Sequence, residues 1–359
     1  MKLKHIFLSA MLTGCLLSAS VQTTSAQSNT AQEVRKTYFV PKAGTLVELM
    51  TEEEANTITH LTLKGKLNAV DFRHLRDEFK HLRFLDLSEA SISRYAGKGG
   101  TRNGLALYPI SVLPDYAFCR QTSDSTYESK QTLHHVILPT KVKAIGERAF
   151  HGCDRLMLCE MRQSEAPDLS LHSMADSLTA IFVPQGATDT YRQNKEWSGF
   201  AIVEGKPLRV NVEISRMSSL ASELQRMGVQ PRDVNFLSIE GKTDEADFRL
   251  IRDYMPNLVS VNLSNSNATT IPEYTFTQKR FLLRILLPKG LKTIGQRAFS
   301  GCSRLGGTMI LPKTVSAIEF GAFIGCDRLR QVVATGNVIT TLGDQLFGDE
   351  ESKLVYRKK

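Results

Sequence analysis

A twelve-residue pattern that recurs at a fixed interval constrains this chain more than any other feature. It reads Ile-Gly-x-x-Ala-Phe-x-Gly-Cys-x-x-Leu and occupies residues 145–156 and 294–305. A looser copy, with Glu319 in place of the first glycine, fills residues 318–329, 24 positions after the second. Self-similarity with a period of this length is the mark of a solenoid. One such unit cannot bury its own apolar face, so it has to stack on copies of itself.

The residues before each pattern read as a short strand. Leu133, Val136 and Leu138 alternate with outward positions, and Pro139 follows, where no further ladder N–H is needed. The stretches that end at Pro288 and Pro312 are built in the same way. The sequence therefore predicts an α/β repeat solenoid, in which short parallel strands stack and the Ile-to-Phe segment turns back beneath each strand.

The Ile-Gly-x-x-Ala-Phe-x-Gly-Cys-x-x-Leu core resembles the BspA-type (Treponema-type) leucine-rich repeat of bacterial surface antigens. The resemblance implies a non-enzymatic recognition protein at the cell surface, one that adheres to host matrix proteins or to other cells. It also implies that the Cys of each repeat is buried and bonded to loop backbone.

A second regularity divides the chain into two copies. Asp71-Phe72-Arg73 recurs 176 positions later as Asp247-Phe248-Arg249, and Leu85–Ser88 matches Val261–Ser264 at the same offset. We predict a repeat block over residues 45–205 (block 1) and another over 206–359 (block 2). Each is expected to begin with a helical N-terminal cap, the first of them from Thr45 to Ala55, after a flexible start at 27–44.

The copies differ in their connecting segments. Block 1 carries a glycine-rich, basic stretch at 94–110 and a polar one at 121–131, both expected to be loops, and block 2 lacks most of this sequence. Block 1 also ends in a segment with Tyr191, Trp197 and Phe200, which resembles the closing segment of such repeat arrays. We expect Trp197 to fill that end as a core residue.

The N-terminus is typical of an export signal. Lys2 and Lys4 precede an apolar run that ends near Ala19, and Thr24-Ser25-Ala26 offers a cleavage site, which makes residues 1–26 a signal peptide. In an alternative interpretation, Leu12–Cys15 is a lipobox and Cys15 becomes a lipidated N-terminus. No later segment is apolar enough to span a membrane. The formal charge of +8 comes without a basic run that interleaves aromatic residues, which argues against nucleic acid as a partner.

The remaining cysteines and histidines offer no catalytic constellation. Cys302 and Cys326 lie in neighbouring repeats within backbone reach of a disulfide, but their side chains should point the same way, so we expect free thiols. Cys159 near His134 or His135 is the one conceivable nucleophile and is better explained as an ordinary buried thiol. The sequence shows no zinc, phosphate-loop or serine-hydrolase motif, so we expect no enzyme, metal or cofactor.

What remains is the outward face of the predicted sheet, several of whose side chains are large and apolar. Contiguous exposed apolar area marks a binding surface. We expect this face to bind a protein or glycoprotein, although flanking loops or the other block can also cover it. Self-association into an envelope structure is an alternative, and a carbohydrate-binding or enzymatic role is less favoured. The predicted face comprises Phe84, Asp86, His135, Ile137, Phe236, Ser238, Ser260, Asn262, Arg284, Leu286, Thr308 and Ile310.

Overall fold

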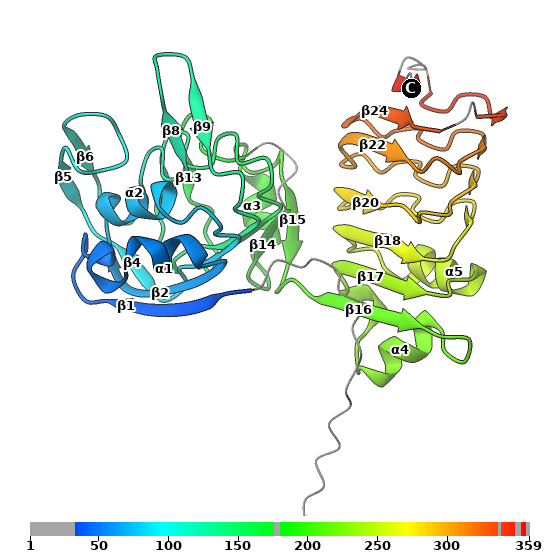
Figure 1. The fold of residues 1–359 in the computed structure, drawn as a ribbon, viewed down its shortest axis with the longest axis horizontal. Coiled ribbons are helices and arrows are strands. Elements are labelled where there is room, and N and C mark those ends of the chain that lie inside the picture. The colour runs from blue at the N-terminus through cyan, green and yellow to red at the C-terminus, as the bar shows by residue number, and fades with distance from the viewer. Residues whose placement is uncertain (1–32, 176–179, 337–338, 349–352, 357–359) are drawn as a thin grey trace, which may run out of the picture. The chain divides into compact units, whose positions relative to one another are not determined.

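The computed structural model describes residues 33–175, 180–336, 339–348 and 353–356, and residues 34–359 form one compact unit. Its core is built from parallel strands stacked coil upon coil (Figure 1). The predicted signal peptide, with Cys15, lies outside the described residues. None of the described helices combines the length and apolar composition that a membrane crossing requires.

Block 1 contains one main parallel sheet and a smaller one on the opposite side of each coil. The main sheet has the order β1 (Arg35–Val40), β2 (His60–Leu67), β3 (Phe84–Asp86), β10 (His135–Ile137), β12 (Leu158–Glu160), β14 (Ala180–Val183) and β15 (Ala201–Glu204), and β4 (Ala90–Ile92) pairs with β2. The smaller sheet consists of β7 (Val112–Leu113), β11 (Ala144–Ile145) and β13 (Asp168–Leu169). The predicted α/β leucine-rich-repeat solenoid is thereby confirmed.

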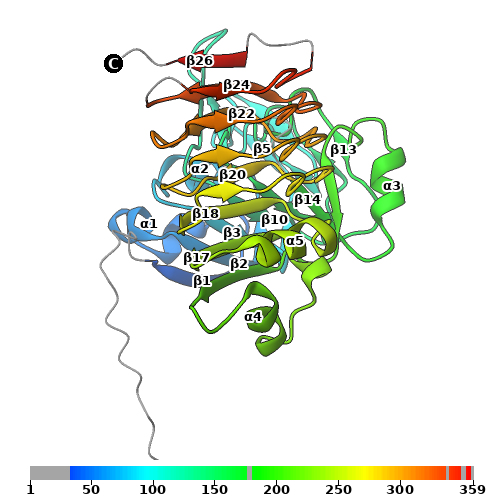
Figure 2. The same cartoon turned by 90° about the vertical axis from the view of Figure 1, so that its right-hand side faces the viewer.

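Block 2 repeats this plan with fewer interruptions (Figure 2). Its main face comprises β16 (Arg209–Ile214), β17 (Phe236–Gly241), β18 (Ser260–Ser266) and β20 (Arg284–Leu286), followed by β22 (Gly307–Leu311), β24 (Leu329–Ala334) and β26 (Leu354–Tyr356). The opposite side holds β19 (Thr270–Ile271), β21 (Thr293–Ile294), β23 (Ala317–Ile318) and β25 (Thr341–Leu342).

The first coil of each block differs from the prediction. Residues 35–40, expected to belong to a flexible start, form β1 and pair in parallel with β2. The helix predicted from Thr45 to Ala55 is instead a 3-10 turn, η1 (Leu46–Leu49), followed by α1 (Glu52–Thr57). Block 2 opens in the same way with β16, α4 (Leu220–Arg226) and η2 (Pro231–Asp233). That these helices cap the blocks stays a prediction.

The recurring Asp71 and Asp247 are buried structural groups that share a capping role. Each occupies the N3 position of a helix, α2 (Ala69–Asp77) or α5 (Glu245–Tyr254), and closes a capping box. Each also accepts a hydrogen bond from the coil before it, from Leu46 N at 2.9 Å or Leu220 N at 2.8 Å. Both carboxylates are buried, so their recurrence reflects a structural role at the start of each helix.

Stacked phenylalanines occupy equivalent interior positions of successive coils. In block 2, the ring centres of Phe276, Phe299, Phe323 and Phe347 are 5.2, 5.4 and 5.4 Å apart. In block 1 only Phe118 and Phe150 stack, at 5.2 Å. Interior aromatic pairs add about 0.5–1.5 kcal/mol each beyond the burial of their area. The phenylalanine of the repeat pattern therefore forms a stacked column in the interior of each block.

The cysteine of each repeat bonds to the preceding coil, as predicted. The thiols of Cys153, Cys302 and Cys326 donate to the carbonyl oxygens of Phe118, Phe276 and Phe299 at 3.6, 3.0 and 3.2 Å, and these three cysteines are free, as are Cys119 and Cys159.

In the coil that follows each helix, a lysine takes this position. Lys130 Nζ donates to Phe79 O at 2.6 Å and to Arg76 O at 3.1 Å, and Lys279 Nζ donates to Arg252 O at 2.7 Å. A longer side chain is needed there because its acceptors are carbonyls at the C-terminal end of α2 or α5, where a cation is also favoured.

An aromatic segment connects β14 to β15. It contains α3 (Thr188–Gln193) and runs to Phe200. Trp197 is fully buried, stands at right angles to Tyr191 with ring centres 5.3 Å apart, and donates from Nε1 to Pro167 O at 2.7 Å. Trp197 is thus a core residue, as predicted, and its ring is not available to stack on a sugar.

Candidate functional site

The outward side chains of the main sheet form two rows in each block. Parallel pairing without a shift places equivalent residues side by side, so that His135 neighbours Phe84 and Leu158, while Ile137 neighbours Asp86 and Glu160. The inward positions between these rows, such as Leu85, Val136 and Cys159, are fully buried. The outward positions of block 1 therefore form register-matched rows.

Part of that face is covered. Outward residues of β12, β14 and β15 form a buried cluster with Phe236, Val259 and Leu283 of block 2. Phe236 packs on Phe182 at 6.3 Å between ring centres, and the Arg209 guanidinium lies 4.2 Å from the centre of the Phe236 ring. The predicted binding residues His135, Ile137 and Phe236 are buried rather than exposed. Their apolar surface is satisfied within the molecule, which removes the reason for assigning them a ligand.

A charged group accompanies this buried region. His135 Nε2 lies 2.7 Å from Glu160 Oε1, and Arg162 pairs with the other oxygen of the same carboxylate at 3.0 Å. Burial lowers the pKa of His135, although the hydrogen bond and charge of Glu160 act in the opposite direction. Since Glu160 already has two partners, this group resembles a satisfied buried network more than a catalytic pair.

The remaining predicted residues retain access to solvent. Phe84, Asp86, Ser238, Ser260 and Asn262 are half-buried. Arg284, Leu286, Thr308 and Ile310 are exposed, with Leu286 at 49% and Ile310 at 60%. The open part of the predicted face therefore lies on the later coils of block 2.

Four aliphatic residues line up across those coils: Leu286 on β20, Ile310 on β22, Val333 on β24 and Val355 on β26. We call them the apolar row. Ile310 pairs with Val333 and Val333 with Val355 in register, and Leu286 stands 24 positions before Ile310 in the preceding repeat. Val355 is 39% exposed and Val333 is half-buried. Alternation along β24 had indicated that Val333 faces outward, whereas Val355 extends the site beyond the predicted residues.

A hollow of about 310 Å³ lies beside the apolar row. Its lining includes Arg284, Leu286, Thr308 and Ile310 from block 2, together with Asp154 and Met157 from block 1. The site thus combines aliphatic side chains with a cation, a carboxylate and a hydroxyl. Such a set can bury an apolar group of a ligand and orient its polar neighbours.

The cysteines of the described residues are poorly suited to nucleophilic chemistry. Burial raises the pKa of the Cys153 and Cys326 thiols to about 12, and it raises the pKa of Cys159 as well. The thiolate is the reactive form, so these groups stay inert at neutral pH. Among the residues that the structure describes, no three His, Cys, Asp or Glu side chains gather as metal ligands would.

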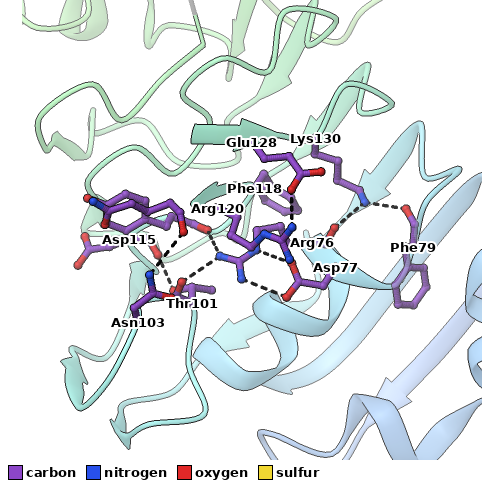
Figure 3. A network of polar contacts seen from close by, with 12 residues as sticks. Arg76, Asp77, Phe79, Thr101, Asn103, Asp115, Phe118, Arg120, Glu128 and Lys130 are labelled. Carbon is purple, nitrogen blue, oxygen red and sulfur yellow. Dashed lines mark hydrogen bonds and ion pairs between the residues drawn. The ribbon is translucent and has the colours of Figure 1, made fainter. Parts of the chain in front are cut away.

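A polar network, which sequence reasoning missed, anchors the two insertions of block 1 (Figure 3). Arg76 of α2 donates to Thr101 O at 2.9 Å and to Tyr116 O at 3.0 Å, and pairs with Asp77. The predicted loop at 94–110 is a hairpin of β5 (Tyr95–Gly97) and β6 (Ala106–Tyr108). The polar stretch at 121–131 belongs to a second hairpin, β8 (Cys119–Gln121) with β9 (Tyr127–Ser129).

Comparison with known proteins identifies the repeat. A family model described as the BspA type leucine-rich repeat region matches residues 115–188 and 253–355 in six copies. The chain carries BspA-type leucine-rich repeats. Leucine-rich repeats generally mediate protein interactions, and proteins with BspA-type repeats are typically surface-associated. The matched ranges include Arg284, Leu286, Thr308, Ile310 and the rest of the apolar row.

A solved structure gives a second comparison for this leucine-rich-repeat protein. This chain is similar to the crystal structure of a leucine-rich repeat protein from Bacteroides ovatus ATCC 8483. The sequence identity is 14%, the match covers 84% of this chain and 85% of that chain, and the TM-score is 0.30. No curated protein matches the chain.

Proposed function

We propose that this protein is an exported recognition scaffold that binds a protein or glycoprotein through the apolar row and the adjoining hollow. Adhesion to host matrix or to other cells is the role that fits such a scaffold. The exposed apolar row carries the proposal. Residues 1–26 support export, because they have the composition of a signal peptide.

The apolar row is unusual for a parallel sheet. Parallel sheets are normally covered on both faces, because their strands are apolar on both sides. Here Leu286, Ile310 and Val355 remain 39–60% exposed on β20, β22 and β26. Exposed apolar side chains that gather on one face of a sheet mark a surface that a partner covers.

A polar row borders the apolar one. Arg284, Thr308 and Gln331 occupy the other outward position of the same strands, and Gln331 Nε2 donates to Thr308 Oγ1 at 3.2 Å. An apolar centre with a polar margin is the usual anatomy of a protein–protein interface. The strands already fix the side chains in place, so little conformational entropy is lost when a partner binds.

Charge substitution within the apolar row tests the proposal. The variant Leu286→Glu/Ile310→Glu should lose at least about tenfold in affinity for its partner, since two carboxylates would be desolvated in the interface. The chain starting at Gln27 would be used to capture ligands from host matrix and serum, with mass spectrometry as the readout and surface plasmon resonance on each captured protein.

Leu342→Glu provides a matched control. Leu342 is the same residue type, is 46% exposed and lies on β25, on the opposite side of the coil. Its substitution should leave capture and the melting temperature unchanged. Equal capture by the wild type and the double variant would reject the apolar row as the site.

Self-association is the competing role for the same surface. Light scattering of the wild type over a range of concentrations distinguishes the two, because oligomers that disappear in Leu286→Glu/Ile310→Glu would show that the apolar row binds another copy. A monomeric wild type that captures a matrix protein supports recognition of a foreign ligand.

A further inference from the structure

The β5–β6 hairpin of block 1 has two chemically different faces. In its antiparallel register, Tyr95 is opposite Tyr108 and Ala96 is opposite Leu107. The two tyrosine rings lie 6.0 Å apart on the inner face, where Tyr108 is only 3% exposed. Alternation along the strands therefore turns Ala96 and Leu107 outward.

The outer face is aliphatic and cationic. Leu105 and Leu107 are 77% and 75% exposed, and Ile110, just after β6, is 61% exposed. Arg94 and Lys98 are also exposed, and residues 94–110 contain neither Asp nor Glu. The third cation, Arg102, is engaged with Asp115 and Glu147 at 2.8 and 3.1 Å.

The hairpin is firmly anchored. Tyr108 Oη accepts from Arg102 N at 2.7 Å and Tyr95 Oη accepts from Gly99 N at 3.1 Å. The Thr101 hydroxyl donates to Asp115 O, and Arg76 donates to Thr101 O. These bonds fix the exposed leucines on a rigid support, so inserting them into a new environment requires little further ordering.

The repeat itself does not require this hairpin. In block 2 the chain passes from β18 to β19 through residues 267–269 alone. Figure 1 shows the β5–β6 hairpin standing out from the coils of block 1. The exposed leucines are thus an addition to the repeat plan and contribute nothing to stacking of the coils.

We propose that the outer face of the β5–β6 hairpin docks on an anionic lipid surface. Leu105, Leu107 and Ile110 would enter the boundary between headgroups and acyl chains, and Arg94 and Lys98 would lie among lipid phosphates. Two features favour lipid over a protein partner. The tyrosines of the hairpin, a residue type common in protein hot spots, face inward, and an exposed aliphatic face needs no complementary pocket in a fluid layer.

Vesicle flotation tests the proposal. The chain starting at Gln27, which keeps every described residue and excludes acylation of Cys15, is mixed with vesicles of phosphatidylglycerol and phosphatidylethanolamine or of phosphatidylcholine alone. We expect binding to the anionic vesicles only. Leu105→Ser/Leu107→Ser should lower partitioning at least about tenfold. Arg94→Glu/Lys98→Glu should lower it by about fivefold for each lost cation, and added salt should reproduce that loss.

Met217→Ser is the control, because Met217 is 96% exposed and lies in block 2. It should bind vesicles as the wild type does. Absence of wild-type binding, or full binding by Leu105→Ser/Leu107→Ser, overturns the proposal. Loss of matrix-protein capture by that variant, without any vesicle binding by the wild type, would also overturn it and identify the hairpin as a protein contact. None of these substitutions touches the apolar row, so the two proposals fail independently.

Discussion

Blocks 1 and 2 use the same repeat plan and leave different surfaces open. Gly65 of β2 and Gly241 of β17 occupy equivalent positions, and a Cβ atom at either position would lie 2.3 or 2.4 Å from a carbonyl oxygen of the preceding coil. Both glycines also have positive φ angles, so no other residue fits without strain. The frame of the two blocks is thus the same down to single backbone positions.

The arginine–aspartate pairs of α2 and α5 show where the blocks diverge. Arg76–Asp77 and Arg252–Asp253 are equivalent, and in each the guanidinium pairs with the neighbouring carboxylate, at 2.7 or 2.8 Å. In block 1, Arg76 also donates to Thr101 O, which belongs to the insertion at 94–110, and to Tyr116 O, and its side chain is only 7% exposed. Arg252 is 35% exposed. An existing surface pair has therefore become the anchor of an added hairpin.

Two blocks with the same repeat can therefore expose different surfaces, depending on insertions and on which part of the sheet is covered. Block 1 has its outward sheet partly buried and presents insertions instead. Block 2 has no comparable insertions in its described residues and presents the sheet itself. The two proposed surfaces, the β5–β6 hairpin and the apolar row, follow from this division.

The largest effect is expected from breaking the phenylalanine stack. Phe299 is stacked on both faces, by Phe276 and Phe323, whereas Phe118 is stacked on one face by Phe150 and touches Phe72 edge-on. Both alanine variants should lose about 3–5 kcal/mol of unfolding free energy. Each ring has two aromatic neighbours, and stacked and edge-on pairs contribute similar free energies, so the two losses should agree within about 1 kcal/mol. Urea unfolding measures both, and a clearly larger loss for one variant would contradict the equivalence of the two positions.

Substitution of Arg76 and Arg252 is expected to lower the unfolding free energy less, and by different amounts in the two blocks. Arg76→Met leaves two carbonyl acceptors without a charged donor and should destabilise by about 2–4 kcal/mol, while Arg252→Met should stay within about 1 kcal/mol. Limited trypsin digestion checks the local consequence, since Lys98 and Arg102 lie in the hairpin that Arg76 anchors. Faster cleavage there in Arg76→Met alone is the expected result; equal behaviour of the two variants would show that the insertion does not depend on Arg76.

The sequence predicted what repetition specifies. The phenylalanine stack, the cysteine hydrogen bonds and the alternation of the strands follow from residues that recur at fixed spacing, because stacking equivalent coils leaves one solution for each position. The first strand of each block was missed, because β1 and β16 carry no repeat consensus. Only the alternation of Val210, Val212 and Ile214, and of Tyr38 and Val40, marked them.

The candidate site could be predicted only in part. Alternation shows which side chains face outward but contains no information about what covers them. Leu286 and Ile310 were correctly expected to be exposed, whereas Phe236, which also faces outward but in the row of Arg284, is buried against Phe182. The covering residues come from strands distant in sequence, and no local pattern pairs them. The anchoring role of Arg76 was hidden for the same reason, since Thr101 O, one of its carbonyl partners, lies in an insertion.

The smallest losses of unfolding free energy are expected for the two lysines that occupy the cysteine position of the repeat. Their pH dependence also has a predicted direction. Lys130 donates to two carbonyl oxygens and Lys279 to one. At neutral pH, Lys130→Met should therefore cost about 2 kcal/mol of unfolding free energy and Lys279→Met about 1 kcal/mol. Equal losses would mean that the second acceptor, Arg76 O, contributes nothing.

The difference in unfolding free energy between the wild type and each methionine variant should change with pH, because the buried lysines titrate differently in the folded and unfolded states. Burial lowers the pKa of both lysines to about 8 from an ordinary value of 10.5. Between these pH values the folded protein binds fewer protons than the unfolded chain, so the wild type should gain stability relative to either methionine variant as the pH rises. The buried thiols, whose pKa is raised, act in the opposite direction but are present in all three proteins and cancel in the difference. Urea unfolding at pH 7.5 and at pH 10 provides the measurement, and a difference that shrinks with rising pH would show that the lysines are not desolvated in the fold.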